Sequence, residues 1–259
     1  MPHELLTVSH RIARVTLHNP PANVLSLSVL KELDRVFREL EADDYIKVVI
    51  LTGSGRFFSA GADINELVHL NSRLDGSEVS ARGQVFLNRI ERSDKPVIAA
   101  INGTCVGGGL ELAMACHMRL AVAGIALGLP EIKLGLIPGF GGTQRLPRIV
   151  GPSKATELML IGDSITAEEA LKIGLINRVV PATELLDVAN TLAGQIVSNG
   201  RLATQAVLRA IRVGLDCPLA EGLARETELF GELCESADKK EGLQAFLEKR
   251  PPKFLDSEP

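Results

Sequence analysis

Two glutamates lie within apolar, glycine-bearing stretches where a soluble chain rarely places a carboxylate. Glu111 follows the glycines at 107–109 inside an apolar run, and Glu131 follows Pro130. A carboxylate withdrawn from water without a partner is costly, so its pKa changes or it is held for chemistry. One such glutamate alone is more often a rim residue or the partner of an arginine. Two of them, each after a loop that exposes backbone, indicate one pocket that moves protons.

The three glycines at 107–109 are followed at once by the apolar run 110–116, and this pattern predicts a turn that opens a helix. The first N–H groups of a helix have no partner within it and carry partial positive charge, which suits an anion or a developing oxyanion. The alternative is a turn needed only for close packing. A second N–H could come from the stretch 60–64, where the alternative is that Asp63 caps a helix opening at Ile64.

Other common sites are not supported. The glycine-rich stretch 139–145 lacks the lysine of a phosphate loop and the pattern of a dinucleotide site. No Gly-x-Ser-x-Gly nucleophile turn is present. The five histidines have no zinc-site spacing, so we expect no metal.

The composition is that of a folded globular protein. Of the 259 residues, 46% are hydrophobic and 23% are charged, which excludes a largely disordered chain. A net charge of −4 gives no general attraction to nucleic acid or to an anionic membrane, and one tyrosine with no tryptophan leaves little for stacking on bases. No apolar run reaches the ~20 residues that cross a bilayer. We expect neither a nucleic-acid partner nor a membrane partner.

The four cysteines form no C-x-x-C pair, and the first residues lack the regions of a signal peptide. These features favour reduced thiols in a cytoplasmic protein.

Strands alternate with helices over the first three-quarters of the chain, which indicates an α/β architecture. Runs rich in β-branched residues predict strands at 12–17, 47–52 and 96–101. Apolar periodicity predicts helices at 28–42 and 81–92.

Beyond about residue 181 only helical patterns remain. The predicted helices are 183–197, 202–214, 219–234 and 238–248. Capping boxes are predicted for Thr166 with Glu169, in a helix stopped by Gly174, and for Asp238 with Glu241.

Four segments, in this order, resemble the signature segments of the crotonase (enoyl-CoA hydratase/isomerase) superfamily. They are 59–64 (SAGADI), 96–103 (PVIAAING), 107–113 (GGGLELA), and Pro130-Glu131 continuing to 137–145 (IPGFGGTQR). The likeness covers nearly the whole chain and includes the stretch 241–250. It implies an α/β fold in which residues 1–195 form a spiral of ββα units. Residues 196–259 would then form a C-terminal helical subdomain that assembles copies of the chain into a trimer or a dimer of trimers.

The resemblance also implies a coenzyme A thioester whose carbonyl oxygen lies between two backbone N–H donors, at Ala62 and Gly108. Glu111 and Glu131 match both acidic residues of the hydratase branch. Because isomerases and thioester hydrolases of the superfamily often lack or replace one of them, the pair favours water addition. No cofactor is expected, since coenzyme A is part of the substrate. Further contacts with the substrate are implied for six positions: Ala22, Val24, Ala60, Asp63, Ile64 and Phe254.

Three positions depart from the family pattern. Asn65 stands where several relatives have a lysine near the coenzyme phosphates, and the loop 19–24 lacks a basic residue that some relatives have. His117 stands where relatives often have aspartate, and we expect it at a helix exit, outside the chemistry.

These features lead us to expect an enoyl-CoA hydratase of fatty-acid β-oxidation, which adds water to the 2,3 double bond of a 2-enoyl-CoA. One alternative is a hydratase for a branched substrate of the 3-methylglutaconyl-CoA type, and another is an enoyl-CoA isomerase. A third, from a different class, is a binding or scaffold relative without turnover. The stretch 68–77, which matches the family poorly, is expected to influence acyl-chain specificity.

Overall fold

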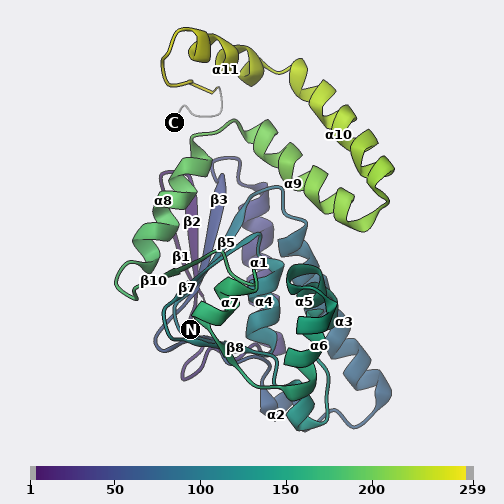
Figure 1. Ribbon diagram of the computed structural model, residues 1–259. Helices are drawn as coiled ribbons and strands as arrows, with labels where there is room; N and C mark the ends of the chain where they lie inside the picture. The colour runs from purple at the N-terminus through teal and green to yellow at the C-terminus, as the bar shows by residue number, and fades with distance from the viewer. Residues whose placement is uncertain (1–3, 255–259) are drawn as a thin grey trace.

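The computed structural model describes residues 4–254 and contains two sheets (Figure 1). The strands in this part of the chain are β1 (Glu4–Ser9), β2 (Ile12–Leu17), β3 (Val48–Gly53), β4 (Phe57–Ser59), β5 (Val97–Ile101), β6 (Thr104–Val106), β7 (Met118–Val122), β8 (Ala126–Gly128), β9 (Ile165–Thr166) and β10 (Arg178–Val180). The larger sheet has the order β1-β2-β3-β5-β7-β10, and the smaller has the order β4-β6-β8-β9. All pairs are parallel except β1 with β2 and β8 with β9.

Helices cover the sheets and form the tail. They are α1 (Leu27–Ala42), α2 (Ile64–Leu67), α3 (Arg73–Glu91), α4 (Gly108–Ala115), the 3-10 helix η1 (Glu131–Leu134), α5 (Gly142–Val150), α6 (Pro152–Ile161), α7 (Ala167–Lys172), α8 (Leu185–Val197), α9 (Arg201–Asp216), α10 (Leu219–Cys234) and α11 (Ala237–Leu247).

From β3 to β8 the chain passes alternately through the larger and the smaller sheet. A helix follows each of these strand pairs, so successive ββα units stack in the parallel order β3, β5, β7. This confirms the expected α/β spiral. The stacking places the ends of β4 and β6 side by side, so the segments that follow them, 60–63 and 107–108, are neighbours.

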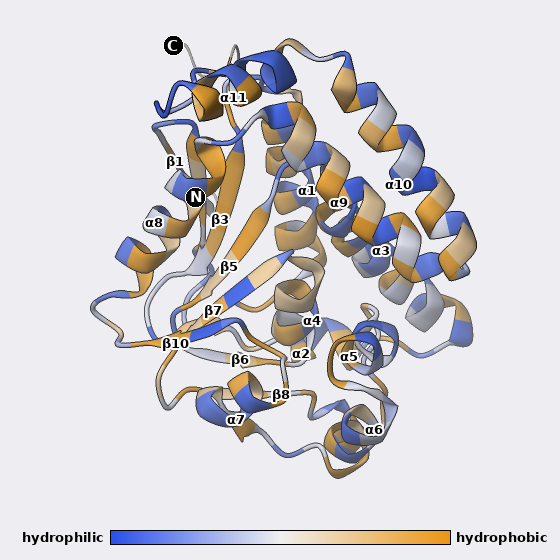
Figure 2. Cartoon of the chain, turned by 45° about the horizontal axis from the view of Figure 1, so that its top comes forward, coloured by the Kyte–Doolittle hydropathy of each residue, from blue (hydrophilic) through white to orange (hydrophobic). Residues whose placement is uncertain are grey.

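The core has two layers, one on each face of the larger sheet. Val49 and Leu51 of β3 face the core that contains α1, α3 and α4, whereas Val48 and Ile50 face α8. A parallel sheet covered on both faces requires such continuous apolar strands, and β3 and β5 are orange along their length in Figure 2. The expected strands 12–17, 47–52 and 96–101 correspond to β2, β3 and β5.

Helix starts follow the capping residues, and two of the sequence expectations need correction. The expected helix 81–92 is the second half of α3, which begins earlier because Ser72 and Asp75 form a capping box. Asp238 and Glu241 form no capping box: Ser236 caps α11 by accepting from the Lys239 N–H. The box of Thr166 with Glu169 is confirmed.

The tail helices α9, α10 and α11 extend from the end of α8 at one side of the molecule (Figure 1). Helices α9 and α10 pack against each other, and both carry orange, apolar positions in Figure 2. Several of these side chains are exposed: Leu219 by 77%, Leu223 by 52% and Phe230 by 69%. No helix within residues 4–254 is both long and apolar enough to cross a membrane.

Candidate active site

Helix α4 carries the first glutamate into the core. All eight of its residues are buried, so the helix is enclosed on every side. The turn before it needs a glycine at 107, because Gly107 has a φ of 54° and a ψ of −132°, a conformation that other residues rarely adopt. The Gly107 N–H donates to the Gly128 carbonyl (2.9 Å), which fixes the turn to the end of β8.

Two backbone N–H groups come together at the start of α4. Gly108 is the first residue of the helix, so its N–H has no acceptor within the helix. A methyl group on Gly108 would stand 3.4 Å from the nitrogen of Ala62, which shows how close the two residues are. Among the hydrogen bonds of residues 4–254, neither of these N–H groups is a donor. They are therefore available to an oxygen atom of a bound molecule.

The segment around Ala62 is held by neighbours on both sides. Leu25 pairs with Ala62 in an isolated parallel bridge, and the Leu25 N–H donates to the Gly61 carbonyl at 2.7 Å. The Asp63 side chain accepts from the Asn65 N–H and caps α2. Asp63 therefore forms the helix cap that the sequence offered as the alternative. The Ala62 N–H takes no part in this cap.

The loop 19–24 forms a wall beside this segment. The Ala60 N–H donates to the Ala22 carbonyl at 2.9 Å, which joins two of the predicted substrate-binding positions. The buried Asn23 shapes the loop by donating to the Ser54 carbonyl (2.9 Å) and the Phe57 carbonyl (2.8 Å). Val24, next in the chain, is half-buried.

Glu111 is 2% exposed, and its Oε1 accepts two backbone hydrogen bonds. The donors are the N–H groups of Phe140 (2.8 Å) and Gly142 (2.7 Å), at the start of α5. Burial raises the pKa of Glu111 from 4.5 to about 7; the nearby Glu131 carboxylate also raises it, and the two N–H donors and Arg145 oppose the rise. Glu111 therefore exchanges a proton near neutral pH.

Glu131 opens η1 on the other side of the Gly107 turn. A methyl group on Gly107 would stand 3.0 Å from Glu131 Oε1, so this carboxylate lies directly against the turn. Its Oε2 atom is buried and has no hydrogen-bond partner among the described residues. Burial raises the pKa of Glu131 as well. An unpartnered buried carboxylate oxygen is costly unless it serves a bound molecule.

The remaining predicted positions are not all brought together. Ile64 is 52% exposed at the start of α2, next to Asp63. Phe254 lies elsewhere: its ring lies against Gly242 of α11, at the opposite end of the molecule from α2 (Figure 1). Within one copy of the chain, Phe254 is thus separate from the two glutamates.

His117 directly follows the C-cap of α4, where the sequence places a helix exit. Its Nδ1 accepts from the Val97 N–H at 2.9 Å, and burial lowers its pKa to about 4. The histidine is therefore neutral and has a structural partner in β5.

Sequence reasoning missed the residues that hold Glu111. The stretch 139–145 was weighed only as a nucleotide loop and as a family signature, yet the N–H groups of Phe140 and Gly142 bind the carboxylate. The usable signal was a glycine-rich turn before a helix, since free N–H groups at a helix start attract carboxylates.

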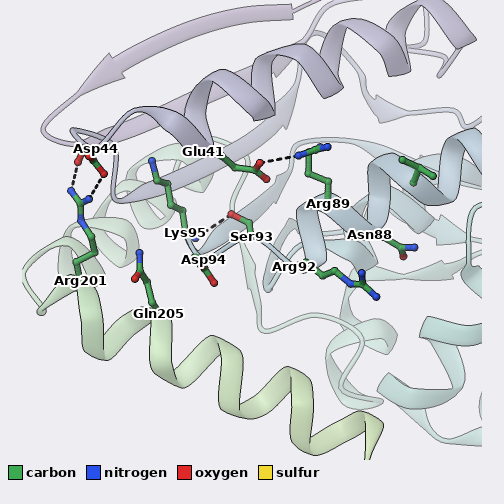
Figure 3. A pocket seen from close by; sticks show the side chains of 11 residues that line it. Glu41, Asp44, Asn88, Arg89, Arg92, Ser93, Asp94, Lys95, Arg201 and Gln205 are labelled. Atoms are coloured by element: carbon green, nitrogen blue, oxygen red, sulfur yellow. Dashed lines mark hydrogen bonds and ion pairs between the residues drawn. The ribbon is translucent and has the colours of Figure 1, made fainter. Parts of the chain in front are cut away.

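A pocket of about 590 Å³ lies away from these glutamates, between the ends of α1 and α3 and the start of α9 (Figure 3). Its charged side chains are largely paired with one another: Arg89 donates to Glu41 at 3.0 Å and Arg201 to Asp44 at 2.7 Å. Glu111 and Glu131 do not line this pocket. This pocket is thus lined mainly by charges paired with one another, and the two glutamates lie outside it.

Comparisons with known proteins show which family the chain resembles. The family model described as Enoyl-CoA hydratase/isomerase matches residues 7–257. A protein of Bacillus subtilis named probable enoyl-CoA hydratase is 46% identical over 96% of this chain and 97% of its own length. A short-chain-enoyl-CoA hydratase of Clostridium acetobutylicum is 44% identical over 95% of each chain.

Solved structures are equally similar. The crystal structure of an enoyl-CoA hydratase from Bacillus anthracis superposes with a TM-score of 0.94 at 38% identity, and covers 98% of this chain and 99% of that one.

Proposed function

The chain belongs to the enoyl-CoA hydratase/isomerase family, and from that premise we propose that it reversibly adds water to a 2-enoyl-CoA to give a 3-hydroxyacyl-CoA. One observation carries the proposal: two shielded carboxylates, Glu111 and Glu131, lie on either side of a turn that presents free backbone N–H groups. Hydration requires this set of groups, because water must lose a proton, a carbon must gain one, and an oxyanion must be stabilised between the two events.

The N–H groups of Ala62 and Gly108 would receive the thioester oxygen. Attack at C3 moves electrons onto that oxygen as an enolate forms, and one well-placed donor contributes about 3 kcal/mol to the transition state. Gly108 adds the partial positive charge at the start of α4.

The glutamates divide the two proton transfers. Glu111 in its ionised form takes a proton from water while the water oxygen bonds to C3. Glu131 in its protonated form gives its proton to C2 as the enolate collapses. The sum is the addition of one water molecule once Glu111 releases the proton that it took and Glu131 is reprotonated. Burial raises the pKa of Glu131, which favours its holding a proton more than a solvated glutamate does, and acid-base groups of this kind contribute roughly 10²- to 10⁴-fold each.

Substrate and setting follow from the same reading. The short-chain relative from C. acetobutylicum supports a short 2-enoyl-CoA as the first substrate to test. The proposed reaction is a step of fatty-acid β-oxidation in the cytoplasm, and it needs no separate cofactor because coenzyme A belongs to the substrate. The exposed apolar faces of α10 support assembly into a trimer or a dimer of trimers.

A hydration assay on Glu111→Gln and Glu131→Gln tests the proposal. Glutamine keeps the shape of the side chain but cannot take up or give the proton, so each variant should lose at least about a hundredfold in kcat while still binding the thioester. Hydration is followed by loss of the absorbance of the conjugated enoyl thioester. Glu157→Gln is the matched control, because Glu157 is exposed on α6 and should leave kcat unchanged.

The same variants separate the alternatives. An isomerase would convert a 3-enoyl-CoA with a gain of absorbance, and Glu111→Gln should spare that conversion if Glu111 serves the water. A wild-type protein that binds enoyl thioesters without converting any of them would instead be a scaffold relative.

A further inference from the structure

Arg145 is a buried arginine of α5, only 7% exposed, that joins three parts of the molecule. Its Nη1 donates to the Phe140 carbonyl at 2.9 Å. Its Nη2 donates to Asn88 Oδ1 (2.6 Å) and to Glu91 Oε2 (2.8 Å), both on α3. The guanidinium is therefore anchored to one long helix while it holds the backbone of the loop before α5.

Phe140 connects this anchor to the site. Its carbonyl accepts from Arg145, and its own N–H donates to Glu111 Oε1 at 2.8 Å. The ring of Phe140 also lies against the start of α4, since a methyl group on Gly108 would stand 3.3 Å from it. One residue thus touches both the glutamate and the residue that carries an oxyanion donor, and Arg145 fixes its orientation.

We propose that Arg145 is a positioning residue for the reaction: through the backbone of Phe140 it holds Glu111 in place, and its positive charge keeps Glu111 able to ionise. The proposal rests on the proposed function where turnover is the readout, and it deepens that function by naming a residue outside the reacting groups.

The charges around Glu111 support this role. Arg145 lowers the pKa of Glu111, whereas Glu131 of η1 raises it. From α3, Glu91 forms an ion pair with Arg145 at 2.8 Å. Of the strands packed against α4, β4 carries no ionisable group, and β6 carries the Cys105 thiol, which is neutral because burial raises its pKa. Arg145 is the cation that acts on the pKa of Glu111, whereas Arg119 of β7 lies at the C-terminal end of α4, where it donates to the Cys116 carbonyl at 2.6 Å.

A purely structural role predicts something different. If Arg145 only ties α5 to α3, its loss should reduce stability and leave the protonation of Glu111 unchanged. If our inference is right, loss of the positive charge raises the pKa of Glu111, and loss of the opposing negative charge at Glu91 lowers it. The two substitutions then shift in opposite directions the part of the pH profile of kcat/KM that follows the ionisation of Glu111.

The experiment measures kcat and KM against pH for Arg145→Met, Arg145→Lys and Glu91→Gln. Arg145→Met should move the limb of kcat/KM that belongs to Glu111 up by about one pH unit. It should also lower kcat about ten- to a hundredfold with little change in KM, since misplaced groups lose rate. Arg145→Lys should leave the limb in place and recover part of kcat. Arg148→Met, which removes an exposed arginine of the same helix, is the control and should change neither.

The experiment stays decisive even if Arg145→Met fails to fold. In Glu91→Gln, Arg145 still donates to Asn88 and to the Phe140 carbonyl, so this variant should keep the fold. In Glu91→Gln, the limb of kcat/KM that belongs to Glu111 should move to lower pH. A limb that stays in place, or moves upward, overturns the proposal, and so does a folded Arg145→Met protein with the wild-type pH profile.

A second readout does not depend on turnover. The difference in melting temperature between each protein and its Glu111→Gln derivative, followed against pH, reports the pKa of Glu111 through proton linkage. If the wild-type protein hydrates no substrate, the proposed function fails, and this measurement alone decides the role of Arg145. If the wild-type protein is active and neither readout shifts, the role of Arg145 is wrong and the function is not affected.

Discussion

Gly83 of α3 lies so close to the ring of Phe140 that a methyl group in its place would stand 2.2 Å from Cδ1. The ring packs between this glycine and the start of α4, so added bulk at either position must push it. The N–H of Phe140 donates to Glu111. The absence of a side chain at Gly83 of α3 therefore helps to set the position of Glu111 on α4.

We expect Gly83→Ala to displace Phe140 and to lower the free energy of unfolding by about 1–3 kcal/mol, the usual cost of overpacking. The kcat of hydration should fall with it. Gly76→Ala, in the same helix but facing open space, is the matched control and should raise stability by about 0.5–1 kcal/mol, because alanine favours a helix. Chemical denaturation measures both. Equal effects from the two substitutions would contradict the packing of Phe140 against Gly83.

The second prediction concerns stability and pH. Burial raises the pKa of Glu111 from 4.5 to about 7, so the folded protein binds its proton more tightly than the unfolded chain. That contribution to stability is fully present below about pH 4.5 and is lost as the pH rises through about 7. Glutamine does not titrate, so the Glu111→Gln variant does not lose this stability as the pH rises. Its stability relative to wild type should therefore increase between about pH 4.5 and pH 8, by up to about 3 kcal/mol.

Thermal unfolding at several pH values measures this difference, and Glu157→Gln should show no such trend. A stability difference for Glu111→Gln that is flat with pH would mean that Glu111 is not perturbed by burial.

A third prediction tests the backbone donors. A methyl group on Gly108 would stand 3.4 Å from the Ala62 nitrogen and 3.3 Å from the Phe140 ring, so Gly108→Ala should crowd the thioester oxygen more than it disturbs the fold. Residue 108 keeps its N–H in this variant, so the loss comes from pushing the oxygen off that donor and can reach the roughly 10²- to 10³-fold in kcat of a lost donor. Gly194→Ala, in an open part of α8, should be fully active. Steady-state kinetics with a folded circular dichroism spectrum would establish the difference; near-normal turnover of Gly108→Ala would exclude Gly108 from the oxyanion site.

The fourth prediction concerns assembly. Phe230 on α10 is 69% exposed, and Leu223, two turns away on the same helix, is 52% exposed. We expect other copies of the chain to cover this apolar face. Phe230→Glu should shift light scattering from a trimer or hexamer toward smaller species. Leu160→Glu, at a leucine 67% exposed on α6, is the control and should keep the wild-type mass. A wild-type protein that is a fully active monomer when dilute would contradict the prediction.

Much of the fold could be predicted because local patterns and tertiary structure agree. The period-2 and period-3.6 patterns located β2, β3 and α1 within one or two residues. The beginning of α3 was missed, because none of the residues in its first turns at 73–80 is buried and they show no continuous apolar face. Only the Ser72 cap indicates where the helix starts. The predicted capping box at Asp238 was wrong for another reason: Ser236 caps α11, and Glu241 accepts from Arg250 instead of the helix start.

The site was predictable in its groups and not in its supports. Glu111 and Glu131 stand out because charged residues are rare in apolar runs. Their neighbours do not: the Phe140 N–H reaches Glu111 from 29 positions along the chain, Arg145 holds the Phe140 carbonyl, and such contacts follow from how the ββα turns stack. The glycine-rich turn before α5 signals that such donors exist, but it does not show which carboxylate they bind.

The complete burial of α4 has a consequence for hydrogen exchange. Its amides can meet solvent only when the core opens, so they should exchange at the rate of global unfolding, whereas the exposed tail helices should exchange through local fluctuations. The protein would then lose its tail order first on mild heating, while Glu111 remains in the last region to open. Loss of assembly and loss of the catalytic centre would therefore be separate events in time.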